Sequence, residues 1–594
     1  MKNSAQKFWE CANKMLPLHR ILKIVQTDPT RTHIKKKYKK NMEQIPSFNA
    51  LIEQSIIKNW DLDALTDYKG TTLQYHDVAR KIEKLHIMFE NGGVKRGDKI
   101  ALCGRNSANW AVAFFATLTY GAVAVPILHE FTADQVHNIV NHSDAKILFA
   151  GDIVAKSIDP TQMPKLEGII NIPDYSLLLS RTEQLTYARE HLNEMFGRKY
   201  PKYFRKEHVS YYKEQSPDEM ALINYTSGTT GFSKGVMIPY RAMWSNWDFA
   251  GEAMGKNIKQ GDNYISILPL AHMYGMAFEL IYEFSIGMHI YFLNRVPSPA
   301  IIAQAFAEVK PSIIIAVPLI IEKIIKKRVL PKLENNTMKL LLKMPVINKK
   351  VNERICEQVV NAFGGNFYEI IVGGAGINQE VEAFLKRIEF PYTVGYGATE
   401  CAPIICYAGW ETFKQGSCGR AAKNMEVRID SPDPANIPGE ILTRGLNVML
   451  GYYKNEEATR NTIDKDGWYH TGDLGLMDRE GNVFIKGRSK NMLLSFNGQN
   501  IYPEEIEDKL NSMPMVSESV VVQREAKLVG LVYPDFDEAK AMGFTREDLN
   551  NIMEQNRQEL NAILPAYSKL SAIQIHDEEF SKTPKKSIKR YLYT

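Results

Sequence analysis

The residues best suited to chemistry lie together in residues 225–235, which read Tyr-Thr-Ser-Gly-Thr-Thr-Gly-Phe-Ser-Lys-Gly. Glycines let a backbone approach a ligand and present its N–H groups, while hydroxyls and a lysine ammonium offset the charge of phosphate oxygens. A Ser/Thr/Gly cluster alone is more often a solvated turn, but the lysine between two apolar runs favours a polyphosphate-binding loop. It is not a Walker A loop, because Lys234 follows Ser233 and precedes Gly235.

Strand-like runs flank this loop at residues 220–223 and 236–238. Further runs alternate with helical segments over the first two-thirds of the chain, at residues 99–103, 123–126, 146–150, 312–317 and 368–372. This alternation predicts an α/β fold with mostly parallel sheets covered on both faces. Two charged stretches without such runs, about 176–216 and 322–362, are predicted to be helical insertions. From about Gly439, shorter strands with Gly and Asp turns predict a small antiparallel or β-barrel-like unit.

Composition describes an ordinary globular protein of several structural units. The chain has 594 residues, 44% hydrophobic and 24% charged, and a net charge of only +5, so no nucleic-acid partner is expected. Six scattered cysteines form no CxxC pair and no zinc-like spacing, which favours free thiols.

The apolar run 111–128 is interrupted by Gly121 and Pro126, so we expect a helix over 110–120 and a strand over 122–127 instead of a membrane span. No signal peptide is predicted, and the expected location is the cytoplasm.

The N-terminal arm is strongly basic. Residues 1–40 contain eleven Lys and Arg against Glu10 and Asp28. One interpretation is a solvated arm. The other is peripheral contact with the inner face of a membrane, since each cation near an anionic surface adds about 1 kcal/mol. Loss of vesicle binding after removal of residues 1–40 would support the second interpretation, and unchanged binding would exclude it.

The phosphate-loop segment resembles the signature of the adenylate-forming superfamily, which includes acyl-CoA synthetases, luciferases and the adenylation domains of peptide synthetases. Further segments match this superfamily in the same order: 268–275 (LPLAHMYG), 372–376 (VGGAG), 394–400 (VGYGATE), 468–473 (WYHTGD), 486–490 (KGRSK) and 497–507 (NGQNIYPEEIE). The resemblance is strongest to long-chain fatty acyl-CoA synthetases, because of VPLIIEK at 317–323, the charged insertion before 372, and KRYLY at 589–593.

The resemblance implies roles for individual residues: residues 268–275 would form the loop that faces the acyl carboxylate, and residues 372–376 and 394–400 the strand ends that bind adenine. It implies nucleotide binding by Thr226, Ser227, Gly228, Thr229, Thr230, Gly231, Lys234, Gly374, Ala375, Tyr396, Gly397, Ala398, Thr399, Glu400, Asp473 and Arg488. It implies catalytic roles for His272, Glu400, Lys234 and Lys586, metal contacts by Thr226 and Glu400, CoA contacts by Asn497 and Gly498, and a hinge at Lys490. The residue types suit these tasks: a carboxylate binds Mg²⁺ well, and the acceptor-only Asp473 suits a ribose diol.

The resemblance also implies the domain organisation: a basic arm (1–45), a large AMP-binding domain (46–489) and a small mobile α+β C-terminal domain (490–594). One departure lies near the C-terminus. The family frame Thr-Pro-x-x-Lys reads Thr-Pro-Lys-Lys-Ser at 583–587, so Ser587 stands where a catalytic lysine belongs. We expect the neighbouring Lys586 to replace it, the alternative being a solvated charge run.

The implied activity is long-chain fatty acid–CoA ligation, with ATP, Mg²⁺ and CoA. Fatty acid and ATP would give acyl-AMP and pyrophosphate, and CoA would then take the acyl group. Two alternatives stay open: an acyl-AMP ligase that serves a carrier protein, and a catalytically weakened protein that binds nucleotide and fatty acid. The sequence predicts neither the acyl chain length nor the oligomeric state.

Overall fold

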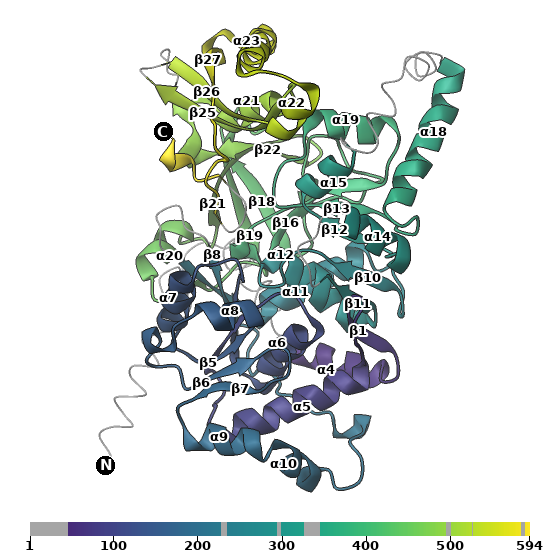
Figure 1. Cartoon of the computed structure of the whole chain (residues 1–594), viewed down its shortest axis with the longest axis vertical. Helices are drawn as coiled ribbons and strands as arrows, with labels where there is room; N and C mark the ends of the chain where they lie inside the picture. Colours follow the sequence, from purple (N-terminus) through teal and green to yellow (C-terminus); the bar gives the residue numbers. More distant parts are fainter. Residues whose placement is uncertain are drawn as a thin grey trace, which may run out of the picture.

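The computed structural model describes residues 45–226, 234–293, 299–325, 345–494, 500–524, 527–583 and 588–593. The molecule is elongated (Figure 1). The helices α5 (Tyr75–Asn91), α9 (Glu183–Glu190) and α10 (Leu192–Lys199) lie at one end of the long axis, and residues 500–524 and 527–575 lie at the other. Residues 1–44 fall outside the described part, so membrane contact by the basic arm stays a prediction.

An eight-stranded sheet forms the centre of the large domain, in the order β20-β9-β8-β4-β3-β5-β6-β7. Its strands are β3 (Lys99–Cys103), β4 (Val123–Ile127), β5 (Ala145–Ala150), β6 (Gly168–Asn171), β7 (Leu177–Ser180), β8 (Met220–Thr226), β9 (Lys234–Pro239) and β20 (Gly451–Tyr452). The central pairs are parallel as predicted, whereas β6–β7, β8–β9 and β9–β20 are antiparallel. The prediction that 176–216 lacks strands is wrong at β7, because a short turn folds its leucines back onto β6.

The apolar run at 111–128 is a buried helix followed by a buried strand, as predicted. Helix α6 (Ala108–Tyr120) begins at Ser107, whose side chain accepts from the Trp110 N–H, and ends at Gly121 in the left-handed conformation, with φ of 84°. The chain then enters β4, which is buried along its whole length. Within the described ranges, no helix is long and apolar enough to cross a membrane.

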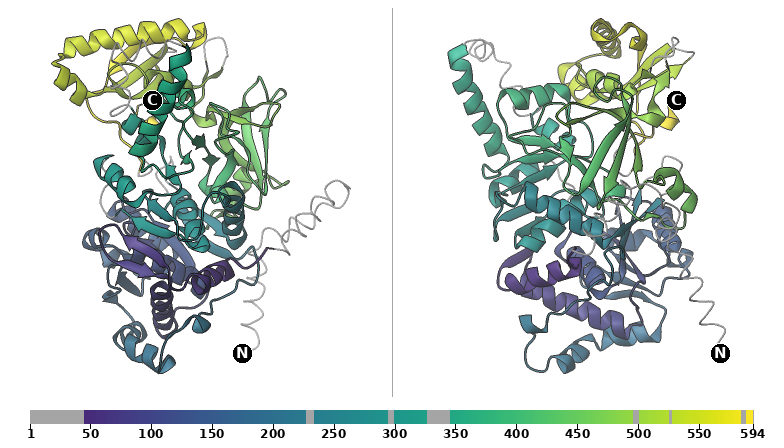
Figure 2. Two further views of the ribbon diagram at one scale, coloured as in Figure 1. Left: turned by 90° about the vertical axis from the view of Figure 1, so that its right-hand side faces the viewer. Right: turned by 180° about the vertical axis from the view of Figure 1, so that it is seen from behind.

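Two smaller sheets extend the α/β part. One has the order β10-β11-β1-β2 and the other is the parallel sheet β12-β13-β14. Their strands are β1 (Asp63–Asp67), β2 (Thr72–Gln74), β10 (Asn263–Ser266), β11 (His289–Phe292), β12 (Ile314–Ala316), β13 (Ile370–Val372) and β14 (Tyr392–Val394). The helices α14 (Pro299–Val309), α15 (Pro318–Ile324) and α19 (Gln379–Arg387) accompany the second sheet. Helix α18 (Pro345–Ala362) belongs to the predicted second insertion and projects from the body (Figures 1 and 2).

Other helices described in the large domain are α4 (Phe48–Lys58), α7 (Ala133–Ser143), α8 (Asp152–Ser157), α11 (Tyr240–Ala253), α12 (Met273–Met276), the π-helical turn η3 (Ala277–Ile281), α13 (Tyr282–Ile286) and α20 (Glu456–Thr462). The predicted antiparallel unit is a four-stranded sheet of order β18-β19-β21-β22. It comprises β18 (Met425–Asp430), β19 (Gly439–Gly445), β21 (Tyr469–Met477) and β22 (Val483–Arg488), and so begins before Gly439. A short antiparallel sheet precedes it: β15 (Tyr396–Gly397), β16 (Ile404–Tyr407) and β17 (Arg420–Ala421).

The C-terminal part is an α+β unit with hydrophobic clusters of its own. It contains β23 (Leu493–Leu494), β24 (Asn500–Ile501), α21 (Pro503–Leu510), β25 (Val516–Arg524), β26 (Lys527–Pro534), α22 (Phe536–Met542), α23 (Arg546–Ile563) and β27 (Leu570–Ile575). Its main cluster includes Ile506, Leu510 and Leu560. Its contacts with the large domain, among the residues that the structure describes, include Asn378 Nδ2 donating to Ser512 Oγ at 2.6 Å and Lys486 Nζ lying 2.9 Å from Glu505 Oε1.

Glu283 in α13 gives a prediction about stability. Its side chain is fully buried, and neither carboxylate oxygen has a hydrogen-bond partner among the described residues. Burial raises the pKa of Glu283 from 4.5 to about 8, so the folded protein holds a proton that the unfolded chain releases. The resulting stability is fully present below pH 4.5 and is lost as the pH rises through about 8. Glu283→Gln should therefore raise the free energy of unfolding at alkaline pH by about 2–4 kcal/mol.

Urea unfolding of both proteins on the acid and alkaline sides of neutrality checks this expectation. The exposed Glu252→Gln is the control, because its side chain is 66% accessible. If the free energy of unfolding fell equally with rising pH in wild type and in Glu283→Gln, the result would contradict a buried, protonated Glu283.

Candidate active site

The ends of β8 and β9 fix the two sides of the predicted phosphate loop. Thr226 and Lys234 are direct partners in this antiparallel pair, as are Tyr225 and Gly235. The loop residues Ser227, Gly228, Thr229, Thr230 and Gly231 lie outside the described residues, and their phosphate contacts stay predictions. The described flanks place a hydroxyl and an ammonium at the two ends of that loop.

Tyr452 joins Lys234 to Glu400. The Lys234 ammonium lies 4.7 Å from the centre of the Tyr452 ring, and the Tyr452 hydroxyl donates to Glu400 Oε1 at 2.9 Å. Burial and the nearby Glu400 carboxylate raise the pKa of Tyr452, so its phenol stays protonated and remains a donor. Strand β20, which carries Tyr452, pairs with β9 next to the phosphate loop. The three side chains therefore form one connected group.

The geometry of Glu400 suits a divalent cation. Its backbone is fixed in the 3₁₀ turn η5 (Thr399–Cys401), where its carbonyl accepts from the Met449 N–H at 2.8 Å. Mg²⁺ in nucleotide sites commonly takes one or two carboxylates, with phosphate and water oxygens completing its shell. Within the described part of the chain, no group of three or more His, Cys, Asp or Glu could hold a metal. A single carboxylate beside a phosphate loop fits an ion that arrives with a nucleotide.

Tyr452 allows a test of this arrangement. Tyr452→Phe removes the hydrogen bond to Glu400 and keeps the ring beside Lys234, so pyrophosphate release at limiting Mg²⁺ should fall about ten-fold. Tyr452→Leu removes the ring as well and should cost a further factor of about three. The control is Tyr453→Phe, whose hydroxyl lies 3.4 Å from Asp144. Equal rates for Tyr452→Phe and Tyr453→Phe would contradict a role for the Glu400 contact.

Asp473, Tyr396 and Arg488 form a second polar group. Asp473 and Arg488 are partners across β21 and β22, with Arg488 Nε 2.7 Å from Asp473 Oδ1. The Tyr396 hydroxyl donates to Asp473 Oδ2 at 2.5 Å. Burial raises the pKa of Asp473, and the Arg488 charge and the Tyr396 hydrogen bond oppose that rise. Tyr396 in β15 and Glu400 in the turn η5 are only four residues apart along the chain, which places the two polar groups near each other.

The predicted adenine-site residues follow the carboxyl ends of the neighbouring strands β13 and β14. Gly374 and Ala375 are exposed directly after the carboxyl end of β13. The neighbouring strand β14 continues through Gly395 into β15, which contains Tyr396 and Gly397. A Cβ at Gly397 would lie 2.3 Å from the Pro403 carbonyl oxygen, so only glycine fits here. Ligands of α/β sheets commonly bind outside such carboxyl ends.

Three side chains hold the segment that leads to His272. Asn106 Oδ1 accepts from the Leu270 N–H at 2.9 Å, and Asn224 Nδ2 donates to the Ala271 carbonyl at 2.8 Å. The buried Glu279 accepts from the Leu268 N–H at 2.9 Å. His272 is half-buried, and its Nδ1 accepts from the Tyr274 N–H at 3.3 Å.

Tyr274 ties this segment to the adenine-site strand. Its hydroxyl donates to the Ile371 carbonyl at 3.1 Å, in the strand that precedes Gly374. The structure thus connects the predicted acyl-carboxylate loop to the predicted adenine loop.

The predicted hinge residue Lys490 lies exposed in the turn η6 (Ser489–Asn491). Asn497, Gly498 and Lys586 lie outside the described residues, so their roles stay predictions. The chain beside Lys586 is anchored: Lys582 and Ile588 form a β-bridge. On the C-terminal side of this bridge, Arg590 donates to both carboxylate oxygens of Glu507, at 2.6 and 2.5 Å.

The sequence motifs did not reveal Tyr452, which lies outside every matched segment. Asn106 and Glu279 were missed for the same reason. Tyr452 and Asn106 act through contacts between distant chain segments, for which a single sequence carries no signal. Glu279 contacts Leu268, only eleven residues earlier, but lies just beyond the matched motif. A correlated pattern among many related sequences could have found them.

Comparison with known proteins decides the family. The AMP-binding enzyme family matches residues 52–453, and the AMP-binding enzyme C-terminal domain matches residues 490–593. This chain belongs to the AMP-binding enzyme family. The superfamily predicted from the motifs is therefore confirmed.

This AMP-binding enzyme is similar to several curated ligases. The long-chain-fatty-acid–CoA ligase ACSBG2 of Rattus norvegicus is 26% identical over 524 residues, which cover 83% of this chain and 76% of the relative. The 4-coumarate-CoA ligase 1 of Narcissus pseudonarcissus is 25% identical over 468 residues, covering 77% of each protein.

A solved structure of the anthranilate CoA ligase AuaEII with anthranoyl-AMP matches the fold. Its TM-score is 0.71 at 19% identity, with 92% of this chain and 96% of that chain covered. The predicted α/β fold, with its large N-terminal and small C-terminal domains, is confirmed.

Proposed function

We propose that this AMP-binding enzyme is a long-chain fatty acid–CoA ligase that forms acyl-CoA from a fatty acid, Mg-ATP and CoA. The observation that carries the proposal is the pair of neighbouring polar groups, Lys234–Tyr452–Glu400 and Tyr396–Asp473–Arg488. One supplies an ammonium and a carboxylate for a metal-bound polyphosphate, and the other supplies a carboxylate for a ribose diol. Together they suit a nucleoside triphosphate.

In the first half-reaction, a carboxylate oxygen of the acid attacks the α-phosphorus of ATP. A new P–O bond forms, the bond from the α-phosphorus to the bridging oxygen breaks, and pyrophosphate leaves with the electron pair. Lys234 offsets the charge that develops on the phosphoryl oxygens, and Glu400 holds the metal ion, which neutralises charge on the phosphates. His272 faces the carboxylate of the acid.

In the second half-reaction, the CoA thiolate attacks the acyl carbon of acyl-AMP. A C–S bond forms, the C–O bond to AMP breaks, and the thiol proton passes to solvent. The residues predicted to contact CoA, Asn497 and Gly498, precede α21 in the small domain. The exposed turn at Lys490 lies between the two domains and suits a change in their orientation between the two steps.

A panel of acids tests the substrate class. Palmitate, octanoate, 4-coumarate and acetate are each supplied with Mg-ATP and CoA, and AMP release is measured. The proposal expects the highest kcat/KM for palmitate. A clear preference for 4-coumarate would move the substrate class to aromatic acids, while leaving the ligase reaction in place.

Two other functions give different results in the same assay. An acyl-AMP ligase would accumulate acyl-AMP without forming a CoA thioester. A weakened binding protein would be stabilised against heat by ATP and would release no AMP with any acid.

A further inference from the structure

Strand β21 is irregular where it carries Asp473. Gly439 pairs with Gly475 and Glu440 with Leu474, but Leu442 then pairs with His470. Leu442 lies two residues after Glu440 on β19, whereas His470 lies four residues before Leu474 on β21. The two extra residues of β21 therefore bulge out of the ladder. Gly472 sits in this bulge with φ of +72°, a conformation that favours glycine. The bulge ends at Asp473.

The Glu440 side chain accepts hydrogen bonds from the bulge, where the backbone pairing between β19 and β21 is interrupted. Its Oε1 accepts from the Gly472 N–H at 2.9 Å, and its Oε2 accepts from His470 Nδ1, also at 2.9 Å. Thr471 completes the bulge: its hydroxyl donates to the Ile441 carbonyl at 2.8 Å and accepts from the Asp473 N–H at 3.0 Å. The Glu440 carboxylate thus holds both sides of the turn that leads into Asp473.

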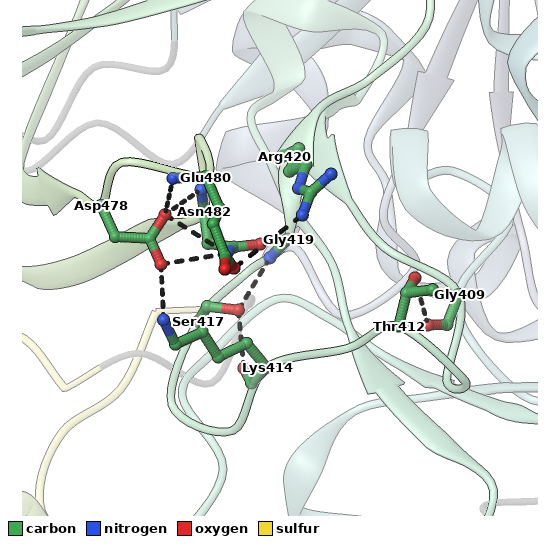
Figure 3. Close-up of polar contacts among 9 residues, drawn as sticks. All are labelled: Gly409, Thr412, Lys414, Ser417, Gly419, Arg420, Asp478, Glu480 and Asn482. Atoms are coloured by element: carbon green, nitrogen blue, oxygen red, sulfur yellow. Dashed lines mark hydrogen bonds and ion pairs between the residues drawn. The ribbon is translucent and has the colours of Figure 1, made fainter.

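The far end of the same hairpin is fastened independently (Figure 3). In the turn between β21 and β22, Asp478 accepts from the backbone N–H groups of Glu480 at 3.0 Å and Asn482 at 2.9 Å. Lys414, from a separate loop, lies 2.7 Å from the Asp478 carboxylate, as Figure 3 shows. Because these contacts fix the turn at one end of β21, the direction of the Asp473 carboxylate depends on the conformation of the bulge at the other end.

We propose that Glu440 is a positioning residue for the ribose contact of the nucleotide. It acts through the Gly472 N–H and His470, and it directs Asp473 to the place where that carboxylate meets Tyr396 and Arg488. The inference rests on the proposed function, in which Asp473 accepts hydrogen bonds from the ribose hydroxyls. Without Glu440, the Gly472 N–H loses its acceptor and the bulge relaxes.

The test compares ATP with 2′-deoxy-ATP and 3′-deoxy-ATP by calorimetric binding to the full chain, so it needs no turnover. Hydrogen bonds to a charged group imply that wild type prefers ATP by about ten-fold or more. Glu440→Ala should weaken ATP binding by about ten-fold and shrink the preference for ATP over the deoxy nucleotides to about two-fold. A purely structural defect would weaken all three nucleotides equally and keep the preference.

Two further variants sharpen the result. Glu440→Gln keeps one carbonyl acceptor for Gly472 or His470, and should recover part of the preference; it also carries the test if Glu440→Ala does not fold. Glu426→Ala is the matched control, since Glu426 lies on the adjacent β18 and pairs with Arg444 at 2.6 Å, away from the bulge. It should bind all three nucleotides like wild type.

Two outcomes would overturn the inference. If both Glu440 variants keep the wild-type preference for ATP, Glu440 does not position the ribose contact, and the proposed ligase reaction is unaffected. If wild type binds ATP and the deoxy nucleotides equally well, Asp473 does not contact the ribose, and the inference fails together with that part of the proposed function. Failure of the ligase reaction itself would appear in the AMP-release assay, which is separate.

Discussion

Replacing Glu400 by Gln should slow acyl-adenylate formation by about 10²–10³-fold, the usual cost of losing one electrostatic stabiliser of a charged transition state. The substitution keeps an oxygen that can accept from the Tyr452 hydroxyl and removes only the charge. Pyrophosphate release from Mg-ATP and palmitate measures the effect. The variant should also need a higher Mg²⁺ concentration, because Mg²⁺ prefers carboxylate ligands.

The control for this experiment is Glu411→Gln, in an exposed loop after β16. It removes the same charge from the same domain and should leave pyrophosphate release unchanged. Wild-type rates and an unchanged Mg²⁺ requirement in Glu400→Gln would remove Glu400 from the proposed metal site.

Replacing Lys586 by Ala should have the second large effect. Adenylation should fall by about 10²–10³-fold if this lysine contacts the acid and the α-phosphate. Thioester formation from supplied acyl-AMP should change little, because the thiol attacks the acyl carbon in that step and the α-phosphorus is no longer attacked. Separate assays of the two half-reactions give the measurement. The anchored flanks, through the Lys582–Ile588 bridge and the Arg590–Glu507 pair, supply a fixed base for such a contact.

Neighbouring positions provide the controls for Lys586. Lys585→Ala removes an adjacent positive charge and should leave adenylation within a factor of about three, the effect expected of a charge that makes no specific contact with the substrate. Adding Ser587→Lys to the Lys586→Ala protein places a lysine at the family position and should restore part of the rate. Equal rates for Lys585→Ala and Lys586→Ala would show that this charge run has no catalytic lysine at 586.

Local sequence signals predicted the elements well where one segment determines its own structure. The helix and strand around Gly121 followed from an apolar run with a glycine stop and a proline, and the structure has both. Strands β8 and β9 followed from apolar runs on either side of the phosphate loop. In these cases, chain neighbours carry most of the information.

The contacts that the sequence did not predict depend on chain segments far apart. Strand β7 forms because a turn brings its leucines onto β6, and helical charge patterns around it hid that pairing. Tyr452 reaches Glu400 only because the two-residue strand β20 adds to β9. Glu440 meets Gly472 across a bulge whose register no single-strand pattern records. The motifs predicted the residues that would bind or act on the substrates, whereas the residues that position them were found only in the folded structure.

The most direct test of the central claim is a balance of products from Mg-ATP and palmitate, with and without CoA. The proposal predicts that AMP and palmitoyl-CoA form in equal amounts, and that AMP release depends on both the acid and CoA. ATP that binds and stabilises the protein, yet yields no AMP with any acid tested, would contradict a ligase and leave a nucleotide-binding protein.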